Sequence, residues 1–204
     1  MTNEIDYTSP DIQFFYDMND SPLFVQNEQN LINIVGKKQL NSLEGSSLLD
    51  IFLSDGHVVE PHYHQNAAEL VYAINGKALV ALLNPFTKQW LTYTITPGQV
   101  TNVPRGWWHY EVALEDDTHL LAIFDAPNPE VILGSDLLAL TPADIISQTY
   151  CINQEQWEET VEPVQPGTYI GPSEDCKQEM RHQPPQAPWI PYYYPSVPYP
   201  FYHG

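Results

Sequence analysis

Basic residues are scarce in this sequence of 204 residues, which contains seven Lys and Arg against 26 Asp and Glu. The net charge of -19 argues against nucleic acid and anionic membrane surfaces as partners, because both attract basic patches. No apolar run reaches the length of a membrane span, and residues 1–15 contain neither a basic residue nor an apolar segment of signal-peptide length. We therefore expect a cytoplasmic protein that binds neither nucleic acid nor membrane.

Cysteine is also scarce, with Cys151 and Cys176 as the only two. Two cysteines do not make the disulfide framework of a small secreted domain, so reduced thiols are favoured, and a bridge between the two stays the alternative. A chain of this length needs no such support, because it can bury a core of ordinary size. We expect one folded domain with additional segments.

The sequence does contain a concentrated group of potential metal ligands. His62, His64 and Glu69 lie within residues 56–76, which read G-H-V-V-E-P-H-Y-H-Q-N-A-A-E-L-V-Y-A-I-N-G. Side chains two residues apart in an extended strand share one face, so both imidazoles can reach one ion. Glu69 has the opposite parity, so it can join them only if residues 65–68 turn the chain into a second strand.

A second stretch, G-Q-V-T-N-V-P-R-G-W-W-H, supplies a fourth candidate ligand, His109. Three side chains alone would leave a divalent ion too open for stable retention, so we expect His109 to join His62, His64 and Glu69. Isolated histidines are more often hydrogen-bonded surface or core residues. We therefore expect no metal at the others, which are His57, His119, His182 and His203.

The two stretches resemble the paired signatures of the cupin superfamily. The first has Gly, five residues, His-x-His, four residues, Glu, six residues and Gly; the second has Gly, five residues, Pro-x-Gly, two residues and His. P-H-Y-H-Q-N-A-A-E is most similar to the germin type, and F-D-A-P-N-P-E and L-T-P-A-D-I-I resemble germin and oxalate decarboxylase tails. One departure is Ala113, where the second signature usually closes with Asn.

This resemblance implies an all-β fold, a single cupin jelly-roll barrel, with Mn(II) held by three His and one Glu. The same ligand set suits Fe(II) and does not exclude Zn, Ni, Co or Cu. The resemblance also implies redox or decarboxylation chemistry on a small carboxylate, as in oxalate oxidases and decarboxylases, and we expect a homo-oligomer. Glu111 shares strand parity with His109, which makes it the candidate catalytic proton relay; an exposed barrel glutamate is the alternative.

A second departure weakens the oxalate assignment. Oxalate decarboxylases of this type carry Arg three residues before the first ligand His, and germin oxalate oxidases carry Asn, whereas this chain has Val59. Arg105 is the only basic residue within either motif, and its Pro and Gly neighbours indicate a structural position at the rim. Aromatic residues near the ligands are candidates for a dry cavity lining, namely Tyr63, Tyr72, Trp107, Trp108 and Tyr110.

Short alternating runs separated by turn residues predict about eight strands of a jelly roll across residues 31–160. Asn75 and Gly76 suit a type I′ hairpin turn, which would pair the strands on either side. We expect a short helix at 142–150 with Thr141 as its N-cap. The strands are expected at 31–35, 47–53, 69–74, 77–83, 89–95, 100–103, 107–114 and 119–124, with an edge segment at 127–132.

Two flanking segments lack strand periodicity. We expect residues 1–30 to be an irregular arm and residues 161–204 a Pro/Tyr-rich tail, disordered or extended, because frequent Pro cannot complete a sheet. The tail should be dispensable for folding and metal binding. Its tyrosines suit contact with another chain, so a non-enzymatic cupin that joins an assembly through this tail is the alternative to a metal enzyme.

Overall fold

The computed structural model describes residues 5–173 and 176, and the other residues of the chain lie outside the described part. Residues 1–172 group as one compact unit by their contacts. The disordered or extended state predicted for the tail falls on residues outside the described part, from 177 onwards. Cys151 and Cys176 are both exposed free thiols.

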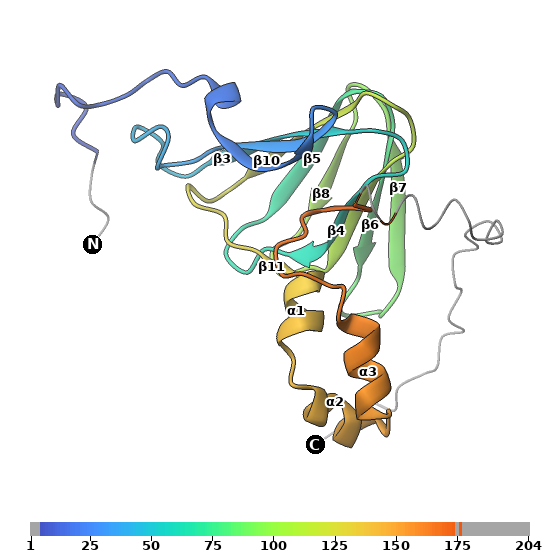
Figure 1. Ribbon diagram of the computed structural model, residues 1–204. Coiled ribbons are helices and arrows are strands. Elements are labelled where there is room, and N and C mark those ends of the chain that lie inside the picture. Colours follow the sequence, from blue (N-terminus) through green and yellow to red (C-terminus); the bar gives the residue numbers. More distant parts are fainter. Residues whose placement is uncertain (1–4, 174–175, 177–204) are drawn as a thin grey trace. The chain divides into compact units, whose positions relative to one another are not determined.

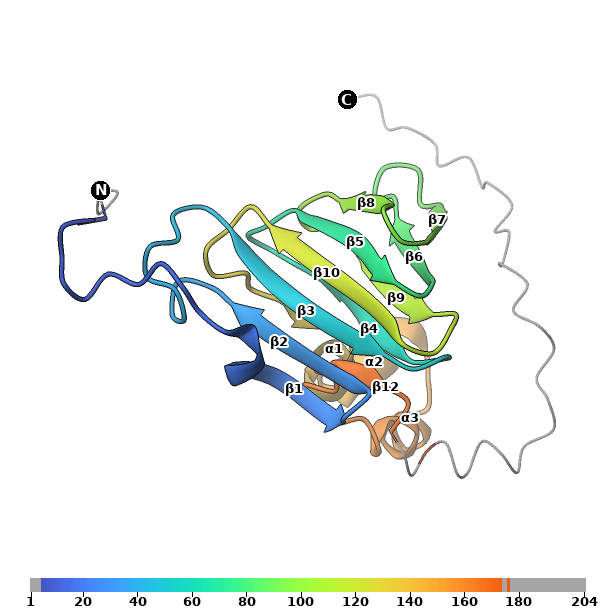
Figure 2. The same cartoon turned by 90° about the horizontal axis from the view of Figure 1, so that it is seen from above.

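Two antiparallel sheets face each other and form the body of the unit (Figures 1 and 2). Sheet A contains, in spatial order, β1 (Pro22–Asn27), β2 (Asn30–Val35), β3 (Ser47–Leu53), β10 (Thr118–Phe124), β5 (Glu69–Asn75) and β8 (Val100–Val103). Sheet B contains β11 (Ile132–Leu133), β4 (Val58–Tyr63), β9 (His109–Ala113), β6 (Ala78–Leu83) and β7 (Trp90–Ile95), and β12 (Ile170–Gly171) also pairs with β4. The predicted all-β fold is confirmed.

The core lies between the two sheets because each strand alternates its side chains between core and solvent. Along β5, Val71 and Ala73 are fully buried, whereas Leu70 and Tyr72 on the other face are exposed. Glu69 shares the inward face with Val71. The same alternation that builds the core thus carries a carboxylate into it.

The predicted hairpin at Asn75 and Gly76 is wrong. β5 belongs to sheet A and β6 to sheet B, so the turn passes the chain from one sheet to the other. Only Gly76 has a positive φ, of 70°, whereas a type I′ turn needs two such residues. A Cβ on Gly76 would lie 2.7 Å from Thr118 Cα, so the close approach of β10 also requires glycine.

Three helices follow the last long strand and lie together beyond one end of the sheets, where Figure 1 labels them. They are α1 (Gly134–Leu140), α2 (Ala143–Tyr150) and α3 (Gln154–Val161). α2 lies where a helix was predicted at 142–150, whereas α1 and α3 were not predicted. The predicted N-cap of α2 is wrong, because Thr141 instead ends α1, where its hydroxyl donates to Leu137 O. Pro142 precedes α2 without a side-chain cap.

The predicted arm contains regular structure, and so does the start of the predicted tail. η1 (Met18–Asp20) and strand β1 fall within residues 1–30, and β1 pairs with β2 at the edge of sheet A. Beyond residue 161, Ile170 pairs with Val59 and is only 2% exposed. The boundary at 161 is therefore wrong, because the chain packs on sheet B as far as β12.

Within the described residues, no helix is long and apolar enough to cross a membrane.

Candidate metal centre

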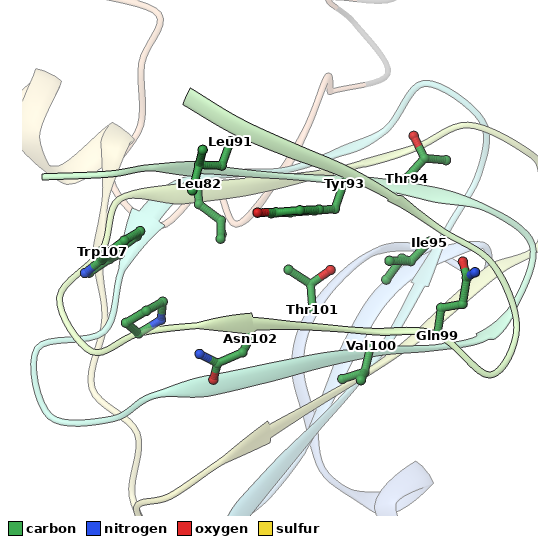
Figure 3. Close-up of a pocket in the computed structure, with 11 residues that line it drawn as sticks. Leu82, Leu91, Tyr93, Thr94, Ile95, Gln99, Val100, Thr101, Asn102 and Trp107 are labelled. Carbon is green, nitrogen blue, oxygen red and sulfur yellow. The ribbon is translucent and has the colours of Figure 1, made fainter. Parts of the chain in front are cut away.

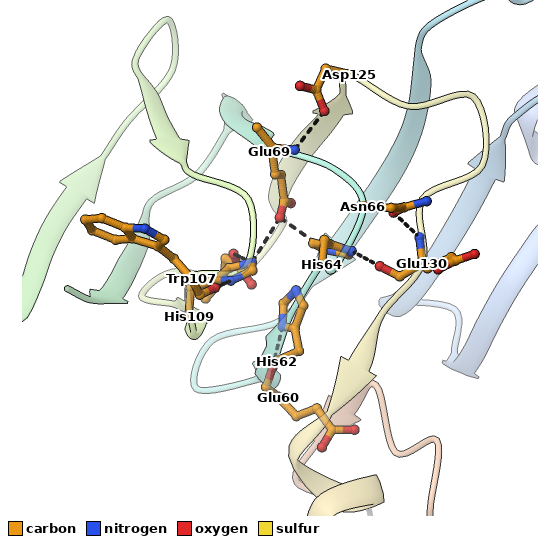
Figure 4. A network of polar contacts seen from close by, with 11 residues as sticks. Glu60, His62, His64, Asn66, Glu69, Trp107, His109, Asp125 and Glu130 are labelled. Atoms are coloured by element: carbon orange, nitrogen blue, oxygen red, sulfur yellow. Dashed lines mark hydrogen bonds and ion pairs between the residues drawn. The ribbon is translucent and has the colours of Figure 1, made fainter. Parts of the chain in front are cut away.

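Four of the predicted site residues meet between the two sheets (Figure 4). His62 on β4 pairs with His109 on the adjacent strand β9, and both belong to sheet B. His64 follows directly after β4, and Glu69 begins β5 in the opposite sheet. Residues 65–68 make the turn that the parity argument required, and this turn connects the two sheets. The group therefore bridges both layers of the fold.

The four residues form a close and buried cluster. One ligand atom from each lies within 4.8 Å of the others. Glu69 Oε2 lies 2.9 Å from His109 Nε2 and 3.4 Å from His64 Nε2. All four residues are at most 6% exposed, and His109 is completely buried. Water therefore competes little for these atoms.

Backbone carbonyls fix the orientation of all three imidazole rings. The Nδ1 atoms of His62, His64 and His109 lie 2.7, 2.9 and 2.9 Å from the carbonyl oxygens of Glu60, Glu130 and Trp107. A carbonyl oxygen can only accept, so each Nδ1 carries a proton and donates it. In the neutral ring the lone pair then lies on Nε2.

This arrangement fits a divalent cation. Imidazole nitrogens that converge with a carboxylate oxygen are an unfavourable group of acceptors unless a proton or a cation lies among them. The buried His64 Nε2 has no hydrogen-bond partner within the described part of the chain, although it lies 3.4 Å from the carboxylate. Three nitrogen donors and one oxygen donor are a common ligand set for Mn, Fe or Zn.

Burial and neighbouring charges set the protonation of the group. Burial favours neutral His109, but the hydrogen bond to Glu69 and the charges of Glu111 and Glu69 outweigh it and raise the pKa of His109 to about 9. For Glu69 burial would raise the pKa, yet the hydrogen bond from His109 and the nearby Nε2 of His64, at 3.4 Å, lower it. Burial and then the charge of His109 hold the pKa of His62 well below its usual range. His109 thus carries the extra proton near neutral pH.

We expect metal binding at pH 7 to release at least one proton per site. His109 must lose its Nε2 proton before this atom can bind a cation, and its pKa of about 9 means that the proton is present at pH 7. Apparent affinity should therefore increase by up to about tenfold per pH unit until the pH passes the pKa of His109. Anaerobic calorimetric titration with Mn(II) in buffers of different ionisation enthalpy measures the proton count. A binding enthalpy independent of the buffer would contradict this prediction.

Glu111 lies beside the cluster and is not one of the four converging residues. Its side chain is 1% exposed, and Oε1 lies 3.8 Å from His109 Nε2. Neither carboxylate oxygen has a hydrogen-bond partner in the described part of the structure. Burial raises the pKa of Glu111 to about 8. The charge of His109 lowers this pKa, and the charge of Glu69 raises it further. The alternative of an exposed barrel glutamate is wrong.

A small cavity of about 100 Å³ lies in front of the cluster. His62, His64, Glu69 and Glu111 form its polar part. The expected aromatic lining is wrong, because none of the five suggested residues borders this cavity, and Tyr169 from the C-terminal segment does. Arg105 is also outside: its side chain is 58% exposed and lies 3.7 Å from Asp125.

A larger hollow, of about 670 Å³, lies between β7 and β8, the edge strands of the two sheets (Figure 3). Leu91 and Tyr93 face it from β7, Thr101 from β8, and Trp107 from the turn before β9. Within the described part of the chain, no His, Cys, acidic or basic side chain lines this hollow. We therefore place the chemistry at the smaller cavity, where titratable groups converge.

The residues that support the cluster were not predicted from the sequence. Two of the three carbonyl acceptors, Glu60 and Trp107, lie two residues before the histidine that each one orients, so this signal was available in the sequence. Glu130 lies 66 residues from His64, and no local pattern connects them. Asp125, which accepts from the Ala68 amide at 2.7 Å in the connecting turn, was also missed.

The remaining histidines of the described chain lie outside the cluster. His57 Nδ1 is 3.2 Å from Ser54 O, and His119 Nε2 is 2.5 Å from Asp50 Oδ1. Neither belongs to the group of converging ligand atoms. His182 and His203 lie outside the described residues.

Comparison with known proteins gives consistent matches. Glycinin G3 from Glycine max is 25% identical over 123 residues, which cover 59% of this chain and 25% of glycinin. Germin-like protein 1-2 from Oryza sativa subsp. japonica is 24% identical over 122 residues, covering 57% of this chain and 54% of that protein. Oxalate decarboxylase from Bacillus subtilis has a similar fold, with a TM-score of 0.66 at 22% identity, over 78% of this chain and 43% of that chain.

The chain thus spans between a quarter and about half of the length of these relatives. A protein-family model described as Cupin matches residues 18–158, from η1 into α3, and so includes all four residues of the cluster. The predicted jelly-roll fold is confirmed by the family match and the structural neighbours together. This chain belongs to the cupin family.

Proposed function

We propose that His62, His64, Glu69 and His109 hold one divalent cation and that the chain is a metal-dependent enzyme acting on a small carboxylate. The proposal is carried by one observation, the three buried imidazoles whose Nδ1 atoms face backbone carbonyls and whose side chains converge with a carboxylate. The chemistry would be redox or decarboxylation, of the kind performed by oxalate oxidases and decarboxylases.

Manganese is the first candidate for the metal. The ligand set suits Mn(II) and Fe(II), and Zn, Ni, Co and Cu also bind such sites. One structure of the Bacillus subtilis oxalate decarboxylase concerns its Mn(II) centres, which supports Mn for a chain of similar fold. A bound divalent ion would supply positive charge to a ligand and, as Mn or Fe, one-electron redox chemistry.

The protein would supply the proton and the dry surroundings. Glu111 borders the cavity and has a pKa of about 8, so it is protonated at pH 7 and can exchange a proton with a bound ligand. Aliphatic side chains from β2 and β3 form much of the remaining wall and exclude water.

We expect Glu111→Gln to retain the metal and to lose turnover by about 10²–10⁴-fold, because the amide keeps the shape of the side chain and cannot transfer a proton as a carboxyl group does. Elemental analysis and rate measurements on the same preparation separate the two effects. An emptied site in this variant would show that Glu111 is a ligand or a necessary support for one.

Metal analysis of the purified protein followed by a substrate screen tests the proposed function. A stoichiometric Mn or Fe content and metal-dependent consumption of a small carboxylate, with oxalate included, is the expected result. A protein purified without a divalent ion, and unable to take one up, would contradict it.

The second candidate is a cupin without catalysis that serves as a component of an assembly. The match to glycinin G3, alongside the germin-like protein, is the observation that favours it. An intact metal site without turnover of any small carboxylate would support this candidate. We retain the predictions of a homo-oligomer, a cytoplasmic location and an assembly role for the tail, which sedimentation and cell fractionation would test.

A further inference from the structure

Outside the metal cluster itself, the walls of the cavity in front of it are apolar. Apart from the His/Glu part, its lining consists of aliphatic side chains and one tyrosine ring; Leu23 is exposed, and the other aliphatic residues are buried or half-buried. These residues are Leu23, Ile32, Ile34, Leu49, Ile51, Val59, Pro129, Val131, Leu133 and Tyr169. Its volume of about 100 Å³ suits a ligand of a few heavy atoms.

Among the residues that the structure describes, no basic side chain borders this cavity. Val59 forms part of the cavity wall and is only 6% exposed. Arg105 cannot supply a cation there, because it lies in an ion pair with Asp125 with its side chain largely exposed. A carboxylate in the cavity would therefore find positive charge only at the metal.

The charges at the site favour a ligand with one negative charge. A divalent cation and the Glu69 carboxylate together leave a net charge of at most +1, and Glu111 can only reduce it further. A monoanion neutralises this charge, whereas a dianion leaves excess negative charge among apolar walls. Burying a charge without a partner is strongly unfavourable.

We propose that this cavity selects an aliphatic monocarboxylate with a short apolar chain over a dicarboxylate such as oxalate. This inference rests on the proposed function, because it assigns the substrate class of the same metal site. The carboxylate would face the metal cluster, and the alkyl chain would contact aliphatic residues of β2 and β3, such as Ile34 and Leu49. Each methylene buried there should increase affinity by about fourfold.

A ligand series on the full-length protein loaded with Co(II) tests the preference, with the visible spectrum of the ion reporting binding. Acetate, propionate and butyrate vary the apolar chain at constant charge, and oxalate and malonate vary the charge at similar size. We expect affinity to increase by about fourfold per methylene from acetate to butyrate, and both dicarboxylates to bind more weakly than propionate. Elemental analysis after each titration verifies that the dicarboxylates have not removed the ion.

Val59→Arg supplies the missing cation, and Val59→Met is the matched control that adds length without charge. We expect Val59→Arg to increase the ratio of oxalate to propionate affinity by at least about tenfold relative to Val59→Met, because a buried cation would then pair with the second carboxylate. If Val59→Arg does not fold, the series on the natural protein decides alone.

The outcomes separate this inference from the proposed function. Tighter binding of oxalate than of propionate by the natural protein, or no gain along the series from acetate to butyrate, overturns the inference and leaves the metal centre standing. Failure to retain any divalent ion overturns both.

Discussion

His64→Ala is expected to lower metal affinity by more than about a hundredfold and to leave the purified protein without its ion. Loss of a residue that merely supports a ligand typically costs 10–100-fold, so loss of a ligand should cost more. His64 is also the ring whose buried Nε2 has no hydrogen-bond partner in the described part of the chain. Replacing it by alanine deletes a metal donor, and the metal-free fold loses the contact of Nδ1 with Glu130 O and the 3.4 Å approach of Nε2 to Glu69.

His119→Ala is the matched control for this experiment. His119 is also a histidine of the barrel, but it pairs with Asp50 and stacks on Phe52, with ring centroids 4.2 Å apart, outside the cluster. Elemental analysis and calorimetric affinity should place His119→Ala with the natural protein. Equal metal content in His64→Ala and the natural protein would remove His64 from the ligand set.

The four converging residues could be predicted because their signal is local and because the chain resembles a known family. His62 and His64 are two residues apart, and Glu69 and His109 lie at fixed distances from glycines that mark turns. Such spacings do not depend on which sheet a strand joins. The prediction therefore survived an error about topology.

That error has a physical cause. The dipeptide Asn75-Gly76 is typical of a hairpin turn, but local turn preference cannot indicate which strands will pair. Here Gly76 is needed because Thr118 approaches it closely, and the chain continues into the opposite sheet. The decisive contact is between residues 42 positions apart, and a local reading of the sequence does not contain it.

The residues that line the cavity could not be predicted from the sequence either. The aromatic residues near the ligands in sequence point elsewhere: Tyr72 lies on the outer face of sheet A, and Trp107 borders the hollow between β7 and β8. The cavity wall comes largely from aliphatic residues of β2 and β3 and from the ring of Tyr169, which lies more than a hundred residues after the first ligand. Sequence proximity to a metal ligand is thus a poor guide to what faces the metal.

The C-terminal segment is the second place where a large effect is expected. We predicted that residues 161–204 are dispensable, and the packing of residues 169–172 reverses this for their part of the segment. Tyr169 N donates to Glu60 Oε1 at 2.8 Å, and Glu60 N donates to Tyr169 O at 2.9 Å. The Tyr169 ring packs against Phe24 with centroids 5.7 Å apart, and Gln26 donates to Pro172 O at 2.9 Å.

Truncation after Glu162 should therefore destabilise the protein by about 4 kcal/mol. Burial of a side chain such as Ile170 contributes roughly 1.5–3 kcal/mol. Loss of the hydrogen bond from the Tyr169 amide, which leaves Ser135 to donate to the buried Glu60 carboxylate, costs roughly 1.5–3 kcal/mol. For a domain of this size the midpoint of thermal unfolding should fall by roughly 8–16 °C. Metal affinity should fall as well, because Glu60 O orients His62 and Tyr169 borders the cavity.

Truncation after Ser173 is the matched control, since it removes most of the Pro/Tyr-rich tail and keeps β12. Its thermal midpoint and metal content should equal those of the full chain, because the contacts of residues 169–172 with β1 and β4 are retained. Differential scanning calorimetry and elemental analysis of the three proteins decide the matter. Equal midpoints after the two truncations would show that β12 does not stabilise the barrel, whereas a large fall after Ser173 would show that residues beyond it contribute to folding.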